Sequence, residues 1–198
     1  MLMINLYTEK RDNTWFGVAT DDRRLYVTTF AFSEKRVLQS LLKNIPYDVP
    51  FQQREKTSSF AERVIALLKD IYDGKNVSHN FALAMEHLSG YTQKVIKTVS
   101  LIPVGYVASY GSVAKAAGGS PRAVGRVMAS NPFVLIVPCH RVVRSDFKLG
   151  GYGSRPDVKL EILKRERRGC TAKREVSVDG EKLLVFPVEF VLKRLGEG

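Results

Sequence analysis

Residues 133–137 (Phe-Val-Leu-Ile-Val) form an apolar run rich in β-branched side chains, and Pro138 ends it. Such a run predicts a buried strand or extended segment, because proline cannot continue a central strand. Cys139, His140 and Arg141 follow directly. Because cysteine is nucleophilic as the thiolate, a thiol beside an imidazole is a candidate nucleophile with its base. The alternative is an inert buried cysteine beside two solvated side chains.

A helix-turn-helix pattern lies just upstream of this segment. Residues 112–117 can form a short helix that a glycine pair closes, and a second helix follows. Ser120 is a good N-cap, Pro121 fits the first helical position, and Asn131 before a proline ends the helix. Two short helices joined by a tight turn are typical of DNA-binding proteins.

The second of these helices is thin, and one face of it is basic. Arg122 and Arg126 are four residues apart and so share a face, whereas Ala123 and Gly125 add little bulk. A slim helix suits the DNA minor groove, which is about 6 Å wide, against roughly 10–12 Å for a helix with side chains. Tight packing between helices would explain the small residues equally well.

Positive charge is concentrated in the same part of the chain. Residues 1–84 hold 12 Lys and Arg against 10 Asp and Glu, whereas residues 85–198 hold 19 against 10. An excess of positive charge in the helix-turn-helix half indicates a polyanionic partner such as nucleic acid. A generally basic protein, or one rich in charge for thermal stability, is the alternative.

Three motifs together resemble one family. Arg-Ala-Val-Gly at residues 122–125, Asn-Pro at 131–132 and Pro-Cys-His-Arg-Val-Val at 138–143 have the order and spacing of the O6-alkylguanine-DNA alkyltransferases, also called methylated-DNA–protein-cysteine methyltransferases. The resemblance covers residues 91–169 and is weak before them. It implies a DNA repair protein that flips O6-alkylguanine out of double-stranded DNA and transfers the alkyl group irreversibly to Cys139 in a single turnover, with no cofactor.

The pattern of elements predicts two domains. Residues 1–84 read as an α/β domain, with strands at 2–8, 14–20, 24–30 and 81–85 and helices at 34–43 and 59–73. The resemblance implies a ribonuclease-H-like fold, and we expect it to act as a scaffold. Some relatives bind zinc in this half; here it has no Cys and His79 as its lone His, so we expect no metal site.

Residues 85–198 are predicted to form a mostly α-helical domain of the winged helix-turn-helix type. Thr92 can cap a helix at 93–102, a strand at 107–110 leads into the helix-turn-helix, and Asp157 can cap a helix at 157–168. Strands at 174–178 and 182–186 flank an Asp-Gly turn, which predicts a hairpin, and residues 187–195 look like a final helix.

The resemblance also implies a role for each of several catalytic candidates. His140 would take the thiol proton through a water, Glu166 would orient His140, and Asn131 would brace the turn before Cys139. Tyr110 would donate a hydrogen bond to the displaced guanine, whose negative charge needs a donor. From the residues alone, Glu166 could be a surface carboxylate, Asn131 a helix C-cap and Tyr110 a core tyrosine.

The remaining candidates would bind substrate. A flipped base needs a pocket, and something must fill the space that it leaves in the duplex, a role that the resemblance gives to Arg122. The pocket candidates are Tyr110, Met128, Val142, Tyr152 and Gly153. The DNA-binding candidates are Arg122, Ala123, Gly125, Thr92, Ser112, Ser120, Arg126 and Ser145.

Two other functions remain open from the sequence. A cysteine hydrolase would use the same Cys139 and His140, although adjacent positions are unlike the usual separated pair. A DNA-binding module could recognise lesions without chemistry. Residues 1–12 carry charges within their apolar stretch and no window approaches membrane-spanning length, so we expect neither a signal peptide nor a membrane helix. The two cysteines fit a reducing compartment, so we expect a cytoplasmic location. We also expect a monomer without membrane association or an obligate protein partner.

Overall fold

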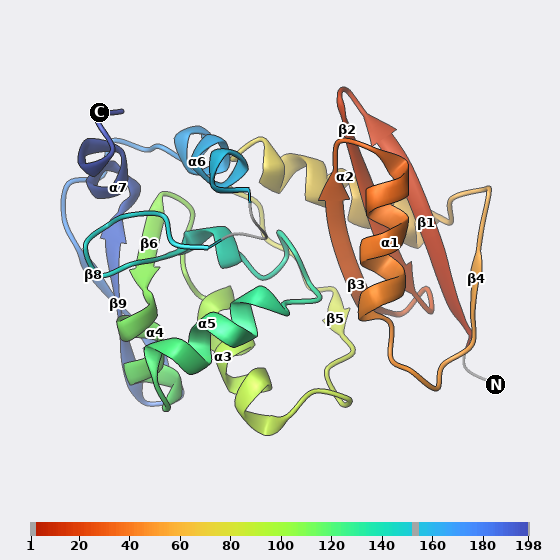
Figure 1. Ribbon diagram of the computed structural model, residues 1–198, viewed down its shortest axis with the longest axis horizontal. Coiled ribbons are helices and arrows are strands. Elements are labelled where there is room, and N and C mark those ends of the chain that lie inside the picture. The colour runs from red at the N-terminus through yellow and green to blue at the C-terminus, as the bar shows by residue number, and fades with distance from the viewer. Residues whose placement is uncertain (1–2, 152–154, 198) are drawn as a thin grey trace. The chain divides into compact units, whose positions relative to one another are not determined.

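The computed structural model describes residues 3–151 and 155–197, and its chain separates into two compact units (Figure 1). Unit 1 comprises Met1–Tyr72, Val77–Leu88 and Pro132–Ile136. Unit 2 comprises Asp73–Asn76, Ser89–Asn131 and Val137–Gly198. The fold is therefore mixed α/β, and the run that precedes Cys139 is shared between the units.

Unit 1 is built on a five-stranded sheet of order β4-β1-β2-β3-β5. The central strands are antiparallel: β1 (Ile4–Arg11), β2 (Thr14–Thr20) and β3 (Arg24–Ala31). Asp12 and Asp22 adopt positive φ in the turns between them, a conformation that Asp tolerates better than most residues. The short strands β4 (Phe51–Gln53) and β5 (Ala82–Leu83) pair in parallel at the two edges.

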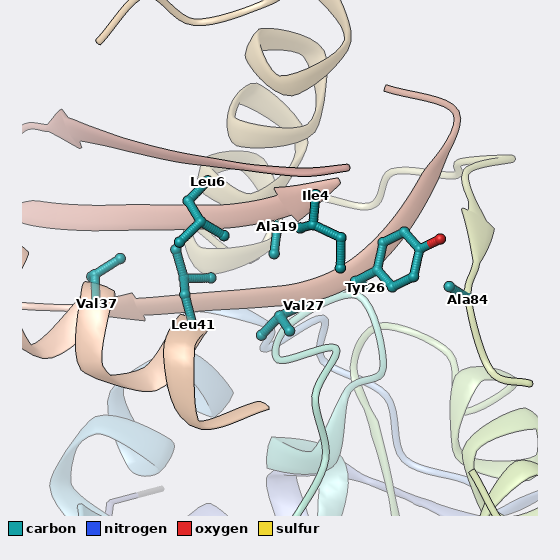
Figure 2. Packing of buried hydrophobic residues seen from close by; sticks show 8 residues of the cluster. All are labelled: Ile4, Leu6, Ala19, Tyr26, Val27, Val37, Leu41 and Ala84. Atoms are coloured by element: carbon teal, nitrogen blue, oxygen red, sulfur yellow. The ribbon is translucent and has the colours of Figure 1, made fainter. Parts of the chain in front are cut away.

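Two helices cover opposite faces of this sheet. Gly17 of β2 faces α1 (Glu34–Asn44), since a Cβ built on Gly17 would lie 2.3 Å from Val37 Cγ1. Its neighbour Phe16 packs edge-on against Tyr72 of α2 (Ser59–Tyr72), with ring centroids 5.8 Å apart. Because adjacent strand residues point to opposite faces, α1 and α2 lie on different sides. Figure 2 shows the α1 side, where buried aliphatic residues pack around Val27, Val37 and Leu41.

The segment before the cysteine is mostly buried but is not a regular strand. Phe133 makes an isolated parallel bridge to Thr28, and the Thr28 hydroxyl donates to Val134 O at 2.8 Å. Leu135 then has φ of 73°, which breaks the extended conformation. Residues 133–137 therefore form neither a regular strand nor a continuous extended segment, because Phe133 makes an isolated bridge and the chain turns at Leu135 and Ile136.

Unit 2 contains a four-stranded sheet of order β7-β6-β9-β8. The strand β6 (Tyr106–Ser109) pairs in parallel with β7 (Val142–Val143) and antiparallel with β9 (Glu181–Pro187). The predicted hairpin is confirmed, because β8 (Arg174–Val178) pairs antiparallel with β9.

Five helices complete the described part of unit 2: α3 (Gly90–Ser100), α4 (Tyr110–Ala117), α5 (Pro121–Ala129), α6 (Pro156–Arg165) and α7 (Val188–Arg194). A second apolar cluster joins β6, β7, α6 and α7; its buried members are Val107, Val143, Leu163, Val188, Val191 and Leu192. The C-terminal elements therefore pack directly on the strand that follows the cysteine.

The predicted boundaries of α3 and α6 are wrong. Ser89, not Thr92, caps α3, and its hydroxyl accepts the Thr92 N–H at 3.2 Å. The helix α6 begins at Pro156, so Asp157 lies inside its first turn. It ends at Arg165, which leaves Glu166 as the C-cap and not an interior helical residue.

Candidate active site

The chain turns sharply at the cysteine. Cys139–Arg141 form one turn of 3₁₀ helix, with Cys139 N–H donating to Val137 O at 2.7 Å and Arg141 N–H donating to Pro138 O at 2.8 Å. On a straight strand, adjacent side chains would point in opposite directions. The turn removes that obstacle for Cys139 and His140, and the side chains of both are buried.

His140 and Arg141 converge on one buried carboxylate. His140 Nε2 lies 2.9 Å from Glu166 Oε1. The Arg141 guanidinium donates to Glu166 through Nε at 2.9 Å and Nη2 at 2.7 Å, and its Nη1 donates to Ile102 O at 2.6 Å. The surface reading of Glu166 is therefore wrong: it has no exposed area and binds both residues that follow the cysteine.

This arrangement sets the ionisation of both groups. Burial opposes charge on Glu166, but the charges and hydrogen bonds of His140 and Arg141 lower its pKa to about 2. Burial lowers the pKa of His140, against the attraction of Glu166. A neutral imidazole beside a carboxylate must donate through Nε2, so Nδ1 carries the lone pair. Nδ1 is buried and has no hydrogen-bond partner among the described residues.

The surroundings of the thiol partly offset the cost of its burial. Burial raises the pKa of Cys139. A hydrogen bond from Asn131, the charge of Lys159 and the backbone N–H groups of Cys139 and His140 all act in the opposite direction. The Asn131 side chain also donates to Val137 O at 3.1 Å, so it spans the turn that carries the cysteine.

Lys159 and Arg141 are buried charged residues that sequence reasoning missed. Lys159 has no exposed area, and its Nζ donates to Val142 O and Leu149 O at 2.6 Å each. Burial lowers its pKa to about 8. The spacing of apolar residues could have predicted that Lys159 is buried. Lys159 precedes the buried Ile162 and Leu163 by three and four residues, so it shares the inner face of α6.

The pocket candidates lie at different depths around this centre. Tyr110 begins α4 and is half-buried, and both burial and the nearby Cys139 raise its pKa, so its hydroxyl remains a donor. Met128 is half-buried on α5, and Val142 is fully buried in β7. Tyr152 and Gly153 lie outside the described residues. A Cβ built on Gly150 would lie 3.1 Å from the Tyr110 ring, so the backbone of residue 150 borders that tyrosine.

The helix-turn-helix candidates form a more exposed surface. Ser120 caps α5 by accepting the Ala123 N–H at 3.2 Å, and Arg122 and Arg126 are exposed. A Cβ built on Gly125 would lie 4.0 Å from the Tyr110 ring. The α5 helix therefore connects an exposed basic face to the tyrosine beside the cysteine.

The other DNA-binding candidates have local partners. Ser112 bonds to Ser109, the N-cap of α4, and Thr92 bonds to Ser89 through its hydroxyl at 2.9 Å. Ser145 is exposed after β7. Hydroxyls held at helix N-termini, where backbone N–H groups are free, are suitable phosphate donors.

The described residues contain no candidate metal site and no candidate membrane-spanning helix. Outside residues 1–2, 152–154 and 198, no group of three or more His, Cys, Asp or Glu side chains could hold a metal ion. Within the same residues, no helix has the length and apolar character to cross a bilayer.

Comparison with known proteins gives consistent matches. Residues 90–168 match the family described as 6-O-methylguanine DNA methyltransferase, DNA binding domain. A methylated-DNA–protein-cysteine methyltransferase of Methanothermobacter thermautotrophicus is 37% identical over 108 residues, covering 53% of this chain and 60% of the relative. A DNA base-flipping protein of Thermus thermophilus is 40% identical over 79 residues, covering 40% of this chain and 54% of the relative. The chain thus spans under two thirds of these relatives.

A solved structure extends the likeness over both units. The crystal structure of O6-methylguanine-DNA methyltransferase from Pyrococcus kodakaraensis KOD1 superposes with a TM-score of 0.63 and 29% identity, covering 83% of this chain and 99% of that one. The matched residues 90–168 contain α5, Cys139, His140 and Glu166. Residues 90–168 are therefore similar to the DNA-binding domain of the 6-O-methylguanine DNA methyltransferases, and the fold of the chain is similar to a solved O6-methylguanine-DNA methyltransferase.

Proposed function

We propose that the protein repairs DNA by transferring an alkyl group from O6 of guanine to the sulfur of Cys139. The observation that carries this proposal is the buried arrangement of Cys139, His140 and Glu166, in which His140 Nδ1 has a lone pair and no described partner. An ion pair that served only the fold would not need a buried imidazole nitrogen without a hydrogen-bond partner on the residue next to the cysteine.

The proposed reaction balances without a co-reactant. The Cys139 thiol gives its proton to His140 Nδ1, directly or through a water, while Glu166 stabilises the imidazolium that forms. The sulfur attacks the alkyl carbon, so a C–S bond forms as the C–O6 bond breaks. The electron pair goes to the guanine, toward which Tyr110 can donate a hydrogen bond. The thiol proton finally resides on the restored guanine.

A single turnover follows from the product. A thioether is not readily cleaved by water, and regeneration would require a second nucleophile to displace it. Neither Glu166 nor Lys159 is free for that task, because Glu166 is bound by His140 and Arg141 and Lys159 by two carbonyls. The protein is therefore consumed stoichiometrically.

The partner in this proposal is double-stranded DNA that carries O6-alkylguanine. The exposed Arg122 would fill the space left by the flipped base, and Arg126 with the cap of α5 would bind phosphates. Extrusion of a base costs a few kcal/mol, which a filling side chain offsets in part. The basic balance of residues 85–198 supports this partner.

The finer features of the fold belong to the same proposal. We propose a ribonuclease-H-like scaffold domain at residues 1–84 and a winged helix-turn-helix domain at 85–198, with the β8–β9 hairpin as the wing. The antiparallel strands β1, β2 and β3, with helices on both faces of their sheet, support the ribonuclease-H-like assignment. We also propose that the protein is a cytoplasmic monomer that needs no protein partner for the reaction.

Counting the repaired guanine tests the function. A duplex with one O6-methylguanine is incubated in excess over the protein, and restored guanine is measured by chromatography. The proposal predicts about one guanine per protein molecule and no more. Many guanines per molecule would identify a hydrolase. Tight binding with no guanine restored would identify a lesion-binding module. The similarity to the DNA base-flipping protein of Thermus thermophilus is the reason to consider this second function.

A further inference from the structure

The turn that follows the active-site strand is held by a cluster of three aromatic rings. Phe147 lies edge-on to Phe186, with ring centroids 5.2 Å apart, and edge-on to Phe190, at 5.5 Å. Phe186 belongs to β9 and Phe190 to α7. Both lie beyond residue 168, where the match to the family's DNA-binding domain ends. We call Phe147, Phe186 and Phe190 the aromatic clamp.

Phe147 is held in a conformation that a bulky side chain rarely adopts. Its φ is 61°, in the left-handed region where the Cβ crowds the backbone. The Phe147 N–H donates to Arg144 O at 3.0 Å, and the Arg144 N–H donates to Lys148 O at 3.0 Å, so the residue sits inside a tight turn. Such strain persists where the surroundings enforce it, and it gathers at functional sites. Here the surroundings include the two rings of the C-terminal elements and the apolar cluster against which Phe147 packs.

The other end of this turn borders the active site. Leu149 O accepts a hydrogen bond from Lys159 Nζ, the same atom that donates to Val142 O. Residue 150 follows at once, and a Cβ built on Gly150 would lie 3.1 Å from Tyr110 Cε2 and 3.3 Å from the Tyr110 hydroxyl oxygen. The backbone at 149–150 is therefore one wall beside the tyrosine, and Lys159 and Phe147 fix it from two sides.

We infer that the aromatic clamp sets the size of alkyl group that the site accepts, by holding residues 144–150 against Tyr110. This inference rests on the proposed function and deepens it. Among the described residues, the clamp makes no ring contact with Tyr110. Phe186 and Phe190 thus act as positioning residues through the turn, and an element outside the matched domain controls specificity inside it.

The test compares two adducts in one DNA sequence. Identical duplexes carry a single O6-methylguanine or O6-benzylguanine, and single-turnover transfer rates are measured with the full chain in excess. Phe190→Ala removes the most exposed ring of the clamp, which is 36% accessible. We expect methyl transfer to slow more than benzyl transfer, so that the benzyl-to-methyl rate ratio rises about 2- to 10-fold, the range that corresponds to losing the Phe147–Phe190 pair, which bears on the turn.

Two further variants make the outcome decisive. Phe81→Ala removes a comparable edge-on pair with Phe60, at 5.3 Å in unit 1, and should leave the ratio unchanged. Phe190→Leu keeps apolar contact without the ring, so it should raise the benzyl-to-methyl rate ratio less than Phe190→Ala does. If the alanine variant does not fold, Phe190→Leu replaces it in the comparison. Equal slowing of both reactions, or a lower ratio, would overturn the inference and leave the proposed function intact. Failure of the wild-type protein to transfer either group would instead overturn the proposed function.

Discussion

The imidazole of His140 and the carboxylate of Glu166 lie 2.9 Å apart, fully buried, although 26 positions separate them in the chain. Arg141, the next residue after His140, binds the same carboxylate and keeps it ionised. Glu166 therefore acts only as an acceptor, and its hydrogen bond fixes the tautomer of His140. The imidazole nitrogen that remains to accept a proton is Nδ1, which has no hydrogen-bond partner among the described residues.

Replacing Glu166 with Gln should slow alkyl transfer by about 100-fold, a typical contribution of general acid–base catalysis. Gln keeps the shape of the side chain but removes the charge that stabilises the imidazolium and orients the ring. Single-turnover rates on a methylated duplex measure the effect. Glu161→Gln is the matched control, because Glu161 lies on α6 and, within the described part of the chain, pairs with the partly exposed Lys164 at 3.3 Å. Equal rates for Glu166→Gln and wild type would remove Glu166 from the relay.

Acid should destabilise the wild-type protein more than the Glu166→Gln variant. The pKa of Glu166 is about 2 in the folded protein, below the ordinary value of 4.5. A depressed carboxyl pKa contributes stability above the unfolded value, and that contribution is lost as the pH falls from about 5 toward 2. Urea unfolding at pH 7, 5 and 3 measures it. The difference in unfolding free energy between the two proteins should shrink on acidification; a constant difference would contradict the depressed pKa.

Lys159 should make the protein more stable in mild alkali. Its pKa is about 8 in the fold against 10.5 ordinarily, so between these values the unfolded chain binds more protons. Stability contributed by this group therefore rises with pH across that window. Unfolding free energy measured from pH 7.5 to 10 should rise in the wild type relative to Lys159→Met. Parallel pH curves for the two proteins would show that Lys159 has an ordinary pKa in the fold.

Arg122→Ala should impair repair of duplex DNA far more than reaction with free O6-benzylguanine. The free base needs no extrusion, so a side chain that fills the vacated stack has no role there. Arg126→Ala is the control from the same face of α5. It should weaken duplex binding and lower the salt dependence of binding by about one counterion, but leave the transfer rate at saturating DNA unchanged. Equal losses for Arg122→Ala on both substrates would contradict its role in flipping.

Local sequence signals predicted much of the fold. The strand at residues 14–20 is confirmed as β2, the cap at Ser120 as the start of α5, and the Asp-Gly turn as the β8–β9 hairpin. Each depends on residues close together in the chain: alternation of apolar residues, a capping hydroxyl or a turn dipeptide. The break in the segment before Cys139 depends instead on Leu135, whose positive φ has no sequence signal.

The candidate site was predicted less completely, for a reason that its buried charges illustrate. The structure brings Cys139, His140 and Glu166 together, and their catalytic roles stay predictions. No role was predicted for Arg141, and the alternative interpretation left it solvated, because its partners Glu166 and Ile102 O come from distant segments. Lys159 was missed for the same reason: a lysine is buried only where carbonyls converge, and convergence is a property of the folded chain.

The most direct test of the account is the location of the transferred carbon. The protein is incubated with a duplex whose O6-methylguanine carries a deuterated methyl group, then digested and analysed by mass spectrometry. The account predicts one labelled methyl on the peptide that contains Cys139, none on Cys170, and no label in the Cys139→Ala variant. Label on any other residue, or an unmodified protein beside repaired DNA, would contradict it.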